Sequence, residues 1–463
     1  MSAPTLLEAS RRLAAGEVTA RSLTEACLDR ITAADDDLRA FITVETEDAL
    51  AQADAADTRR TEGSPRGPLD GLPIAVKDNL AVAGGVTTMG SSLFADHVSA
   101  EDAGVVERLA EQGAVRLGKT NLHEFALGVT TENPHHGICR NPWDRERTPG
   151  GSSGGSAVAV TSGMALGAIG SDTSGSIRIP AAACGILGLK PTYGRISSFG
   201  CYPEAWSLDH VGVLTRTARD AALLLDATSG HDPRVPSSLD LSPTRVAEQL
   251  DHPASAPLRI GVEESFFFAD LDPDVEQVVR ERLDRLAATG AQLVPVSLPT
   301  LAAATWALTV IDTSETTAFH DRQFREHGGE YGADVRQLVE CGALTSAVDY
   351  LQAQQVRRRV AEDFRAAFAG VDVIASPTLP IPTPRIGQSE VVVSGRIRDR
   401  DGELMRLVGP SNLVGIPSVS VPCGMFAGMP VGLQFLGPAL GEAAVLRAAA
   451  LVEEQYRLPA PSA

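Results

Sequence analysis

Residues 150–156 read GGSSGGS, a run of seven residues in which no side chain is larger than a hydroxymethyl group. Runs of glycine and serine usually form flexible linkers between domains. This run instead leads directly into AVAVTSGMALGAIG at 157–170, a segment of small and apolar residues that is typical of a buried core. A linker between domains would not be followed directly by a buried segment. We therefore expect the loop to lie inside one domain, where backbone segments approach closely.

The composition excludes some classes of partner. The chain has 463 residues, of which 43% are hydrophobic, enough for a sizeable core and, by length alone, for about three domains. It carries 40 basic and 59 acidic residues, a formal net charge of −19. Because an acidic surface repels phosphate backbones and anionic lipids, we expect neither nucleic acid nor a membrane as a direct partner.

Neither the start of the chain nor its cysteines indicate export. The first 20 residues lack the basic start and the continuous apolar run of a signal peptide. The six cysteines are scattered and form no C-x-x-C motif, which favours reduced thiols over a disulfide framework. We therefore expect a cytoplasmic protein. The sequence shows no clustered Cys and His ligand set either, so it predicts no metal site.

The order of the apolar segments predicts an α/β protein with a mixed sheet. Short apolar runs such as LPIAVKDN (72–79) indicate buried strands, and segments of helical spacing lie between them. Residues 5–60 are predicted as helices. Residues 258–299 are predicted as a strand–helix–strand unit, with one helix face formed by Val275, Val278, Val279, Leu283 and Leu286. Strands and helices alternate throughout, which favours a layered architecture.

We expect a single domain over 1–463, because the glycine-rich and proline-rich stretches do not separate independent units. Four consecutive parts make it up: N-terminal helices at 1–62, a core at 63–230, a strand–helix–strand and helical part at 231–372, and returning strands with a C-terminal helix at 373–463.

Lysine is rare in this chain. The 40 basic residues comprise 37 arginines and three lysines, Lys77, Lys119 and Lys190. Arginine serves wherever a solvated positive charge is needed, but its guanidinium does not lose a proton in proteins. The three lysines therefore have two explanations. Either they are chance exceptions to a general bias toward arginine, or they are needed for chemistry that requires an amine. All three lie in the part of the chain that surrounds the glycine–serine loop.

Ser176 lies in a second glycine–serine turn, GSDTSGSIRIP at 170–180. Such a turn can direct several backbone N–H groups at one point and stabilise an oxyanion beside a nucleophilic serine, but it can equally be an ordinary tight turn. A histidine base is not favoured. GGSSG matches the G-x-S-x-G elbow of α/β-hydrolases through Ser152, yet no strand precedes it and the last histidine, His327, comes too early. We expect His123, His210 and His320 to be structural or surface residues.

Lys77 is the other candidate base, because it ends an apolar strand. Burial disfavours an ammonium group and lowers its pKa, so that a neutral Lys77 could deprotonate a serine. The alternative is an ion pair with Asp78. Alternation along a strand places neighbouring side chains on opposite faces, which weakens that alternative.

These segments together resemble the amidase signature family. The resemblance runs in order from about residue 5 to 455. It rests mainly on GLPIAVKDN (71–79), GKTNLHEFALG (118–128), TPGGSSGGSAVAV (148–160) and GSDTSGSIRIPAAACGILGLKPTYGR (170–195), with later support from AWSLDHVGVLTRTARDAALLL and GPSNLVGIPSVSVPCG. The resemblance implies a mixed β-sheet core covered by helices on both faces.

The resemblance also implies a set of site residues. Ser176 would be the nucleophile, Ser152 the bridging serine after a cis peptide with Gly151, and Lys77 the base. It implies an oxyanion hole from the backbone N–H groups of Thr173, Ser174, Gly175 and Ser176, substrate contacts at Leu127 and Gly128, and no cofactor.

The chain departs from the family pattern at Ser174. Many relatives have glycine there, and a serine would be strained if the position requires a positive φ. We expect this change to reshape the oxyanion hole slightly and to leave the chain active, because all three residues of the triad are present.

The sequence leaves the substrate open. The segments expected to form the pocket contain few basic residues and offer Leu127, Phe199, Tyr202, Trp206, Trp306 and Leu308. This favours a hydrolase, monomeric or homodimeric, for small uncharged amides and also esters and carbamates, as in aryl acylamidases and urethanases. Two alternatives stay open: the glutaminase component of a tRNA-dependent amidotransferase, which is its A subunit, or an inactive scaffold protein.

Overall fold

The computed structural model describes residues 3–241, 245–252 and 256–461. In this part of the chain, one sheet of 11 strands has the order β1–β3–β2–β6–β8–β7–β14–β15–β11–β9–β10. Its strands are β1 (Phe41–Val44), β2 (Pro73–Lys77), β3 (Val115–Thr120), β6 (Gly167–Asp172), β7 (Leu187–Lys190), β8 (His210–Thr215), β9 (Arg259–Val262), β10 (Gln292–Pro295), β11 (Val373–Pro377), β14 (Ser418–Phe426) and β15 (Met429–Leu436).

The sheet is mixed. Strand β2 is parallel to β3 and β6, and β9 is parallel to β10 and β11, whereas the central pairs from β6 to β15 are antiparallel. Two small hairpins stand apart from it: β4 (Glu132–Asn133) with β5 (Gly137–Ile138), and β12 (Glu390–Val393) with β13 (Arg396–Asp399).

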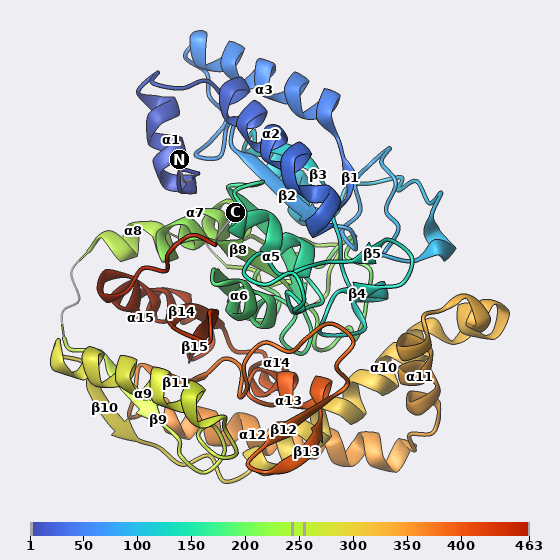
Figure 1. The fold of residues 1–463 in the computed structure, drawn as a ribbon, viewed down its shortest axis with the longest axis vertical. Coiled ribbons are helices and arrows are strands. Elements are labelled where there is room, and N and C mark those ends of the chain that lie inside the picture. The colour runs from blue at the N-terminus through green and yellow to red at the C-terminus, as the bar shows by residue number, and fades with distance from the viewer. Residues whose placement is uncertain (1–2, 242–244, 253–255, 462–463) are drawn as a thin grey trace.

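Helices cover the sheet and confirm the predicted architecture. Figure 1 shows α1–α3 beside β1–β3 at one end of the molecule, and α9 with β9 and β10 at the other. The α-helices are α1 (Leu6–Ala14), α2 (Ala20–Leu38), α3 (Thr46–Thr61), α4 (Gly104–Glu111), α5 (Gly154–Thr161), α6 (Arg178–Cys184), α7 (Ala218–Thr228), α8 (Val246–Asp251), α9 (Pro273–Ala288), α10 (Ala304–His327), α11 (Ala333–Ala343), α12 (Ala347–Ala367), α13 (Arg400–Arg406), α14 (Gly409–Val414) and α15 (Glu442–Gln455). The 3-10 turns are η1 (Ser92–Phe94), η2 (Glu124–Ala126), η3 (Leu301–Ala303) and η4 (Gly328–Glu330).

The strand–helix–strand unit is confirmed, with one correction to its buried face. Asp272 caps the start of helix α9, and its side chain accepts hydrogen bonds from the backbone N–H groups of Asp274 and Val275. The side chains buried on this helix include Val275, Val279, Leu283 and Leu286, whereas Val278 is only partly buried.

The prediction that residues 5–60 are entirely helical is wrong. Residues Phe41–Val44, with the sequence FITV, form β1, which pairs antiparallel with β3 at the edge of the sheet. Four residues are too few for a period of two to be distinguished from helical spacing. Only the partner strand, more than 70 positions later, completes the ladder.

The topology sets the position of the site. Strands β2 and β6 are parallel neighbours, so their carboxyl ends lie at the same edge of the sheet. Lys77 ends β2 and Asp172 ends β6, directly before the turn that contains Ser176. Each of the four predicted parts supplies strands to the main sheet, and the single-domain organisation stays a prediction. Over the described residues, every helix is too short or too polar to cross a membrane.

Candidate active site

The side chain of Lys77 points at two serines. Its Nζ lies 2.7 Å from Ser152 Oγ and 2.8 Å from Ser171 Oγ, and the residue is fully buried. Ser171 also accepts a hydrogen bond of 3.0 Å from Asn79 Nδ2. The lysine predicted from sequence as a base is therefore in direct contact with the predicted bridging serine, and Ser171 holds it there. Sequence reasoning missed Ser171.

Burial lowers the pKa of Lys77 to about 8. Nearby carboxyl groups, among them the ionised Asp172, oppose this shift but do not cancel it. The alternative pairing of Lys77 with Asp78 is wrong, because the Asp78 carboxylate lies 3.0 Å from Nζ of Lys119. Lys77 is thus a buried amine that loses its proton at about pH 8, well below the range of an ordinary lysine.

The glycine–serine loop is a site of close backbone approach, as the sequence predicted. A Cβ atom on Gly151 would lie 2.7 Å from the backbone nitrogen of Thr130, and one on Gly155 would lie 2.3 Å from the Ala40 carbonyl oxygen. The Gly151–Ser152 peptide bond is cis, as the resemblance implied. The loop therefore belongs to the packed core and is not a linker.

Ser176 lies in the turn between β6 and α6 and is 3% exposed. Its carbonyl oxygen accepts a 3.1 Å hydrogen bond from the Ser153 N–H, which fixes the turn against the glycine–serine loop. Within the described residues, the Ser176 hydroxyl has no hydrogen bond, and none joins it to Ser152. The structure thus brings Lys77 and Ser152 into contact and places Ser176 on the adjoining backbone.

The turn provides free N–H groups. The Gly175 N–H donates to Asp172 Oδ1 at 2.9 Å, so it is already used, although the resemblance implied it as an oxyanion donor. The N–H groups of Thr173, Ser174 and Ser176 have no acceptor among the residues that the structure describes. Three N–H groups are therefore free to face a ligand.

The position that requires glycine in this turn is Gly175. Its φ is +126°, and a Cβ there would lie 2.4 Å from Cγ2 of Val408. Ser174 is not among the described residues with positive φ, so serine carries no backbone strain at this position. Its hydroxyl donates a 2.8 Å hydrogen bond to Asp312 Oδ2 on α10.

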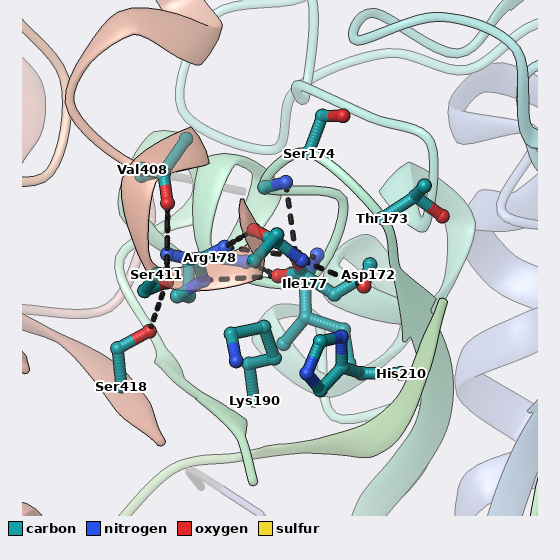
Figure 2. A network of polar contacts seen from close by, with 12 residues as sticks. Asp172, Thr173, Ser174, Ile177, Arg178, Lys190, His210, Val408, Ser411 and Ser418 are labelled. Atoms are coloured by element: carbon teal, nitrogen blue, oxygen red, sulfur yellow. Dashed lines mark hydrogen bonds and ion pairs between the residues drawn. The ribbon is translucent and has the colours of Figure 1, made fainter. Parts of the chain in front are cut away.

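A buried ion pair anchors the turn, as Figure 2 shows. Asp172 Oδ1 lies 2.8 Å from Arg178 Nη2, and both side chains are fully buried. Asp172 also accepts hydrogen bonds from the Ile177 N–H and from Asn412 Nδ2. Burial alone would raise the pKa of Asp172, but the charge and hydrogen bonds of Arg178 outweigh it and hold the pKa well below its usual range.

Arg178 joins the turn to helix α14 and strand β15. Its Nη1 donates to the Val408 carbonyl oxygen, Ser411 Oγ and Gln434 Oε1 at 2.7–2.8 Å. Lys190 lies nearby in Figure 2 and donates to the Ile416 carbonyl oxygen at 2.6 Å. Lys190, like Lys119, therefore stabilises the fold, and of the three lysines only Lys77 faces the two serines.

The predicted structural histidines all have local partners. His210 Nδ1 lies 2.6 Å from the Leu208 carbonyl oxygen, and burial holds the pKa of His210 well below its usual range. His123 Nε2 lies 2.9 Å from Asp334 Oδ2, and His320 Nδ1 lies 2.9 Å from the Tyr331 hydroxyl. Nε2 of His210 and of His320 is buried without a partner among the described residues. In the same part of the chain, no hydrogen bond joins any of the three rings to Ser152 or Ser176, so none of them is placed as their base.

Sequence reasoning also missed a group of carboxylates beside the turn: Glu204, which is buried, and Asp209 and Asp312, which are partly buried. Thr173 Oγ1 donates to Asp209 Oδ1 at 2.7 Å, while Ser174 binds Asp312. Burial raises the pKa of Asp209 to about 7 and that of Asp312 to about 6. The segment YPEAWSLDH contains two of these acids, but nothing in its local pattern predicts that they lie beside the turn.

The predicted pocket residues lie in different environments. Leu127 is buried against Met89, Phe125 and Tyr331, and Gly128 packs against the ring of His123. Leu308 is buried, whereas Trp206 and Trp306 are half exposed.

The other two aromatic residues predicted for the pocket pack against neighbouring side chains. The ring of Phe199 lies beneath the guanidinium of Arg234, and Tyr202 packs between Phe125 and Phe319. Substrate contacts at Leu127 and Gly128 stay a prediction.

Comparisons with known proteins cover almost the whole chain. A family model described as Amidase matches residues 22–446. The A subunit of the glutamyl-tRNA(Gln) amidotransferase from Chromohalobacter salexigens is 42% identical over 96% of this chain and 94% of its own length. A protein from a vestigial complex, described as revealing the origins of an s-triazine catabolic enzyme, is 35% identical over 98% of both chains, with a TM-score of 0.93. The peptide amidase of Stenotrophomonas maltophilia is 31% identical over 99% of this chain and 98% of its own, with a TM-score of 0.87.

Proposed function

The chain belongs to the amidase signature family, and from that premise we propose that it hydrolyses the C–N bond of a carboxamide through an acyl-enzyme on Ser176. One observation carries this proposal: a buried lysine, whose pKa is lowered to about 8, lies 2.7 Å from Ser152 Oγ beside the turn of Ser176. An amine that is neutral near pH 8 can accept a serine proton, which a permanently charged residue cannot. This support favours an enzyme over an inactive scaffold protein.

In the first step, Ser176 Oγ attacks the carbonyl carbon of the amide. The Ser176 proton moves to Ser152 Oγ, and the Ser152 proton moves to neutral Lys77. The carbonyl oxygen becomes an oxyanion, which the free N–H groups of Thr173, Ser174 and Ser176 stabilise.

The C–N bond then breaks. Lys77 returns its proton through Ser152 to the leaving nitrogen, so that an amine or ammonia departs and Ser176 carries the acyl group as an ester. Water attacks this ester by the same proton route, releases a carboxylic acid and restores the Ser176 hydroxyl. These steps use only residues of this chain.

Two finer functions fit this chemistry. The first is the glutaminase component of a tRNA-dependent amidotransferase, in which the amide would be that of glutamine. The 42% identity to the Chromohalobacter salexigens protein supports it, and other curated relatives at 40–41% carry the same description. The second is a free-standing hydrolase of small amides, esters and carbamates. The likeness to the peptide amidase supports it, at lower identity. The sequence similarity thus favours the amidotransferase component over the free-standing enzyme predicted first.

A kinetic comparison tests the proposed amide hydrolysis and also distinguishes the amidotransferase component from the free-standing hydrolase. The purified chain is assayed alone with glutamine, p-nitroacetanilide and a p-nitrophenyl carbamate. More than tenfold higher kcat/KM for glutamine supports the amidotransferase component, and the reverse order supports the free-standing hydrolase.

The Ser176→Ala variant is the control for the chemistry. It should lose turnover of every substrate and keep the circular dichroism and melting temperature of the wild type. A fluorophosphonate probe should label Ser176 in the wild type only, and labelling of another serine would contradict the proposed nucleophile.

A further inference from the structure

We propose that Glu204 binds a protonated amine of the substrate, so that the molecule cleaved at Ser176 is an amide that carries an ammonium group. This inference rests on the function proposed above and names the class of its substrate. It differs from the uncharged substrate that the scarcity of basic residues in the expected pocket segments predicted.

The first observation is an unsatisfied carboxylate. Glu204 is 6% exposed, and its Oε2 has no hydrogen-bond partner among the residues that the structure describes. A buried carboxylate oxygen without a donor is strongly unfavourable, because it has lost its hydration and gained nothing in return. A ligand that brings N–H donors to this oxygen removes that penalty.

The second observation is where this carboxylate lies. Asp209 joins Glu204 to the turn of Ser176, because one of its carboxylate oxygens accepts a hydrogen bond from Thr173 Oγ1 and the other accepts one from the Glu204 backbone. The Glu204 N–H donates to Asp209 Oδ2 at 3.0 Å, and its carbonyl oxygen accepts a 3.1 Å hydrogen bond from Thr316 Oγ1 on α10. Both bonds fix the backbone that carries the carboxylate.

The third observation is the sign of the surrounding charge. Asp209 and Asp312 lie close enough to act on Glu204, and each already has a hydroxyl donor, from Thr173 and Ser174 respectively. Glu315 is satisfied by the N–H and hydroxyl of Ser207. The guanidinium of Arg357 is bound to the hydroxyl and carbonyl oxygens of Ser207. Glu204 is therefore the acid of this group whose oxygen still lacks a donor.

These charges favour an ammonium group over a neutral donor. Burial and the neighbouring carboxylates raise the pKa of Glu204 well above its usual range, which favours the neutral form of its side chain. A bound cation reverses this tendency, because a charge-assisted hydrogen bond stabilises the ionised carboxylate. The same negative charges repel a substrate carboxylate from this end of the site.

A pair of isosteric amides tests the inference. 4-Aminobutanamide and pentanamide differ only in an ammonium group that replaces a terminal methyl group, four bonds from the carbonyl carbon. At about pH 8.5 an alkyl ammonium is still protonated. We expect kcat/KM for ammonia release to be at least about tenfold higher for 4-aminobutanamide.

The Glu204→Gln variant removes the charge and keeps the shape. It should lower the ratio of the two kcat/KM values at least about tenfold. Glu453→Gln is the matched control, because Glu453 is also a carboxylate with a raised pKa, about 8, and it binds the Ala218 N–H away from Ser176. In this control the ratio should equal that of the wild type.

Binding to the Ser176→Ala variant separates the inference from the proposed chemistry. Calorimetry should show tighter binding of 4-aminobutanamide than of pentanamide, and the preference should vanish in Ser176→Ala/Glu204→Gln. Equal binding of the two amides, or a preference that survives Glu204→Gln, overturns the inference. A third outcome is possible, in which 4-aminobutanamide binds more tightly than pentanamide but the wild type and Ser176→Ala release ammonia at equal rates. In that case Ser176 is not the nucleophile, and the assignment of Glu204 as the amine-binding residue is still supported.

Discussion

Lys77 Nζ lies 2.8 Å from the hydroxyl oxygen of Ser171, the residue directly before the Asp172 that anchors the turn of Ser176. The end of strand β6 therefore positions both the candidate base and the candidate nucleophile. Ser171 contacts Lys77, and the adjacent Asp172 binds the turn that carries Ser176. A displacement of β6 therefore moves Lys77 and Ser176 together and tends to preserve their relative position.

The Lys77→Arg variant should be as inactive as Lys77→Ala. Arginine keeps the positive charge, but its guanidinium cannot accept a proton from Ser152 at any pH at which the protein is folded. We expect kcat/KM to fall at least about 100-fold in both variants, within the range that general-base catalysis contributes. If Lys77→Arg keeps more than about a tenth of the wild-type kcat/KM, Lys77 acts only as a counter-charge.

The activity should fall as the pH decreases below about 8. The neutral form of Lys77 is the reactive one, and its pKa is about 8 because burial disfavours the ammonium. Each pH unit below the pKa leaves about a tenth of the neutral amine, so log kcat/KM should fall with a slope of about one. A kcat/KM profile that is flat down to about pH 5 would contradict a neutral lysine base.

The Asp172→Asn variant should lower the free energy of unfolding by about 3–5 kcal/mol, because it leaves the buried charge of Arg178 without its carboxylate. The measurement is urea denaturation followed by circular dichroism. Asp321→Asn is the control, since Asp321 forms an exposed pair with Arg325 on α10 that contributes about 0–1 kcal/mol. Equal effects of the two substitutions would show that the buried pair contributes no more than the exposed one.

The Gly175→Ala variant should lower kcat by about 100-fold, because the new Cβ would overlap Val408 and force the N–H donors of the turn away from the oxyanion. Gly428→Ala is the control. Gly428 also has a positive φ, +79°, but no atom lies within 4 Å of the added Cβ, and it lies in the turn between β14 and β15. A fully active Gly175→Ala variant would show that the turn tolerates a side chain.

Local pattern was enough to predict the elements that hold Lys77 and Ser152. A short apolar run ending in a lysine predicts a buried strand with an amine at its end, and β2 ends at that lysine. The glycines of the loop were correctly interpreted as sites of close approach. Burial of β2 requires a short run of apolar residues, and the lack of space in the loop requires a short run of small residues. Both requirements act on adjacent residues, so both can be recognised in the local sequence.

The carboxylates around Ser174 could not be predicted in this way. Asp312 lies 138 positions after the serine that binds it, and its role follows from the packing of α10 against the turn. The use of the Gly175 N–H by Asp172 was equally hidden, because it depends on the conformation of the turn and not on residue type. Contacts between distant segments leave no periodicity in a single sequence.

The attachment of Arg178 has a consequence for biosynthesis. Its partners Val408, Ser411 and Gln434 follow it by 230 to 256 positions. A ribosome that has translated the first 400 codons has therefore made Lys77, Ser152 and Ser176 but none of those partners. Domains complete their packing as their last elements emerge, so the guanidinium stays without these acceptors until Gln434 has left the ribosome. The nascent polypeptide should consequently gain its proposed amide-hydrolysing activity only after that point.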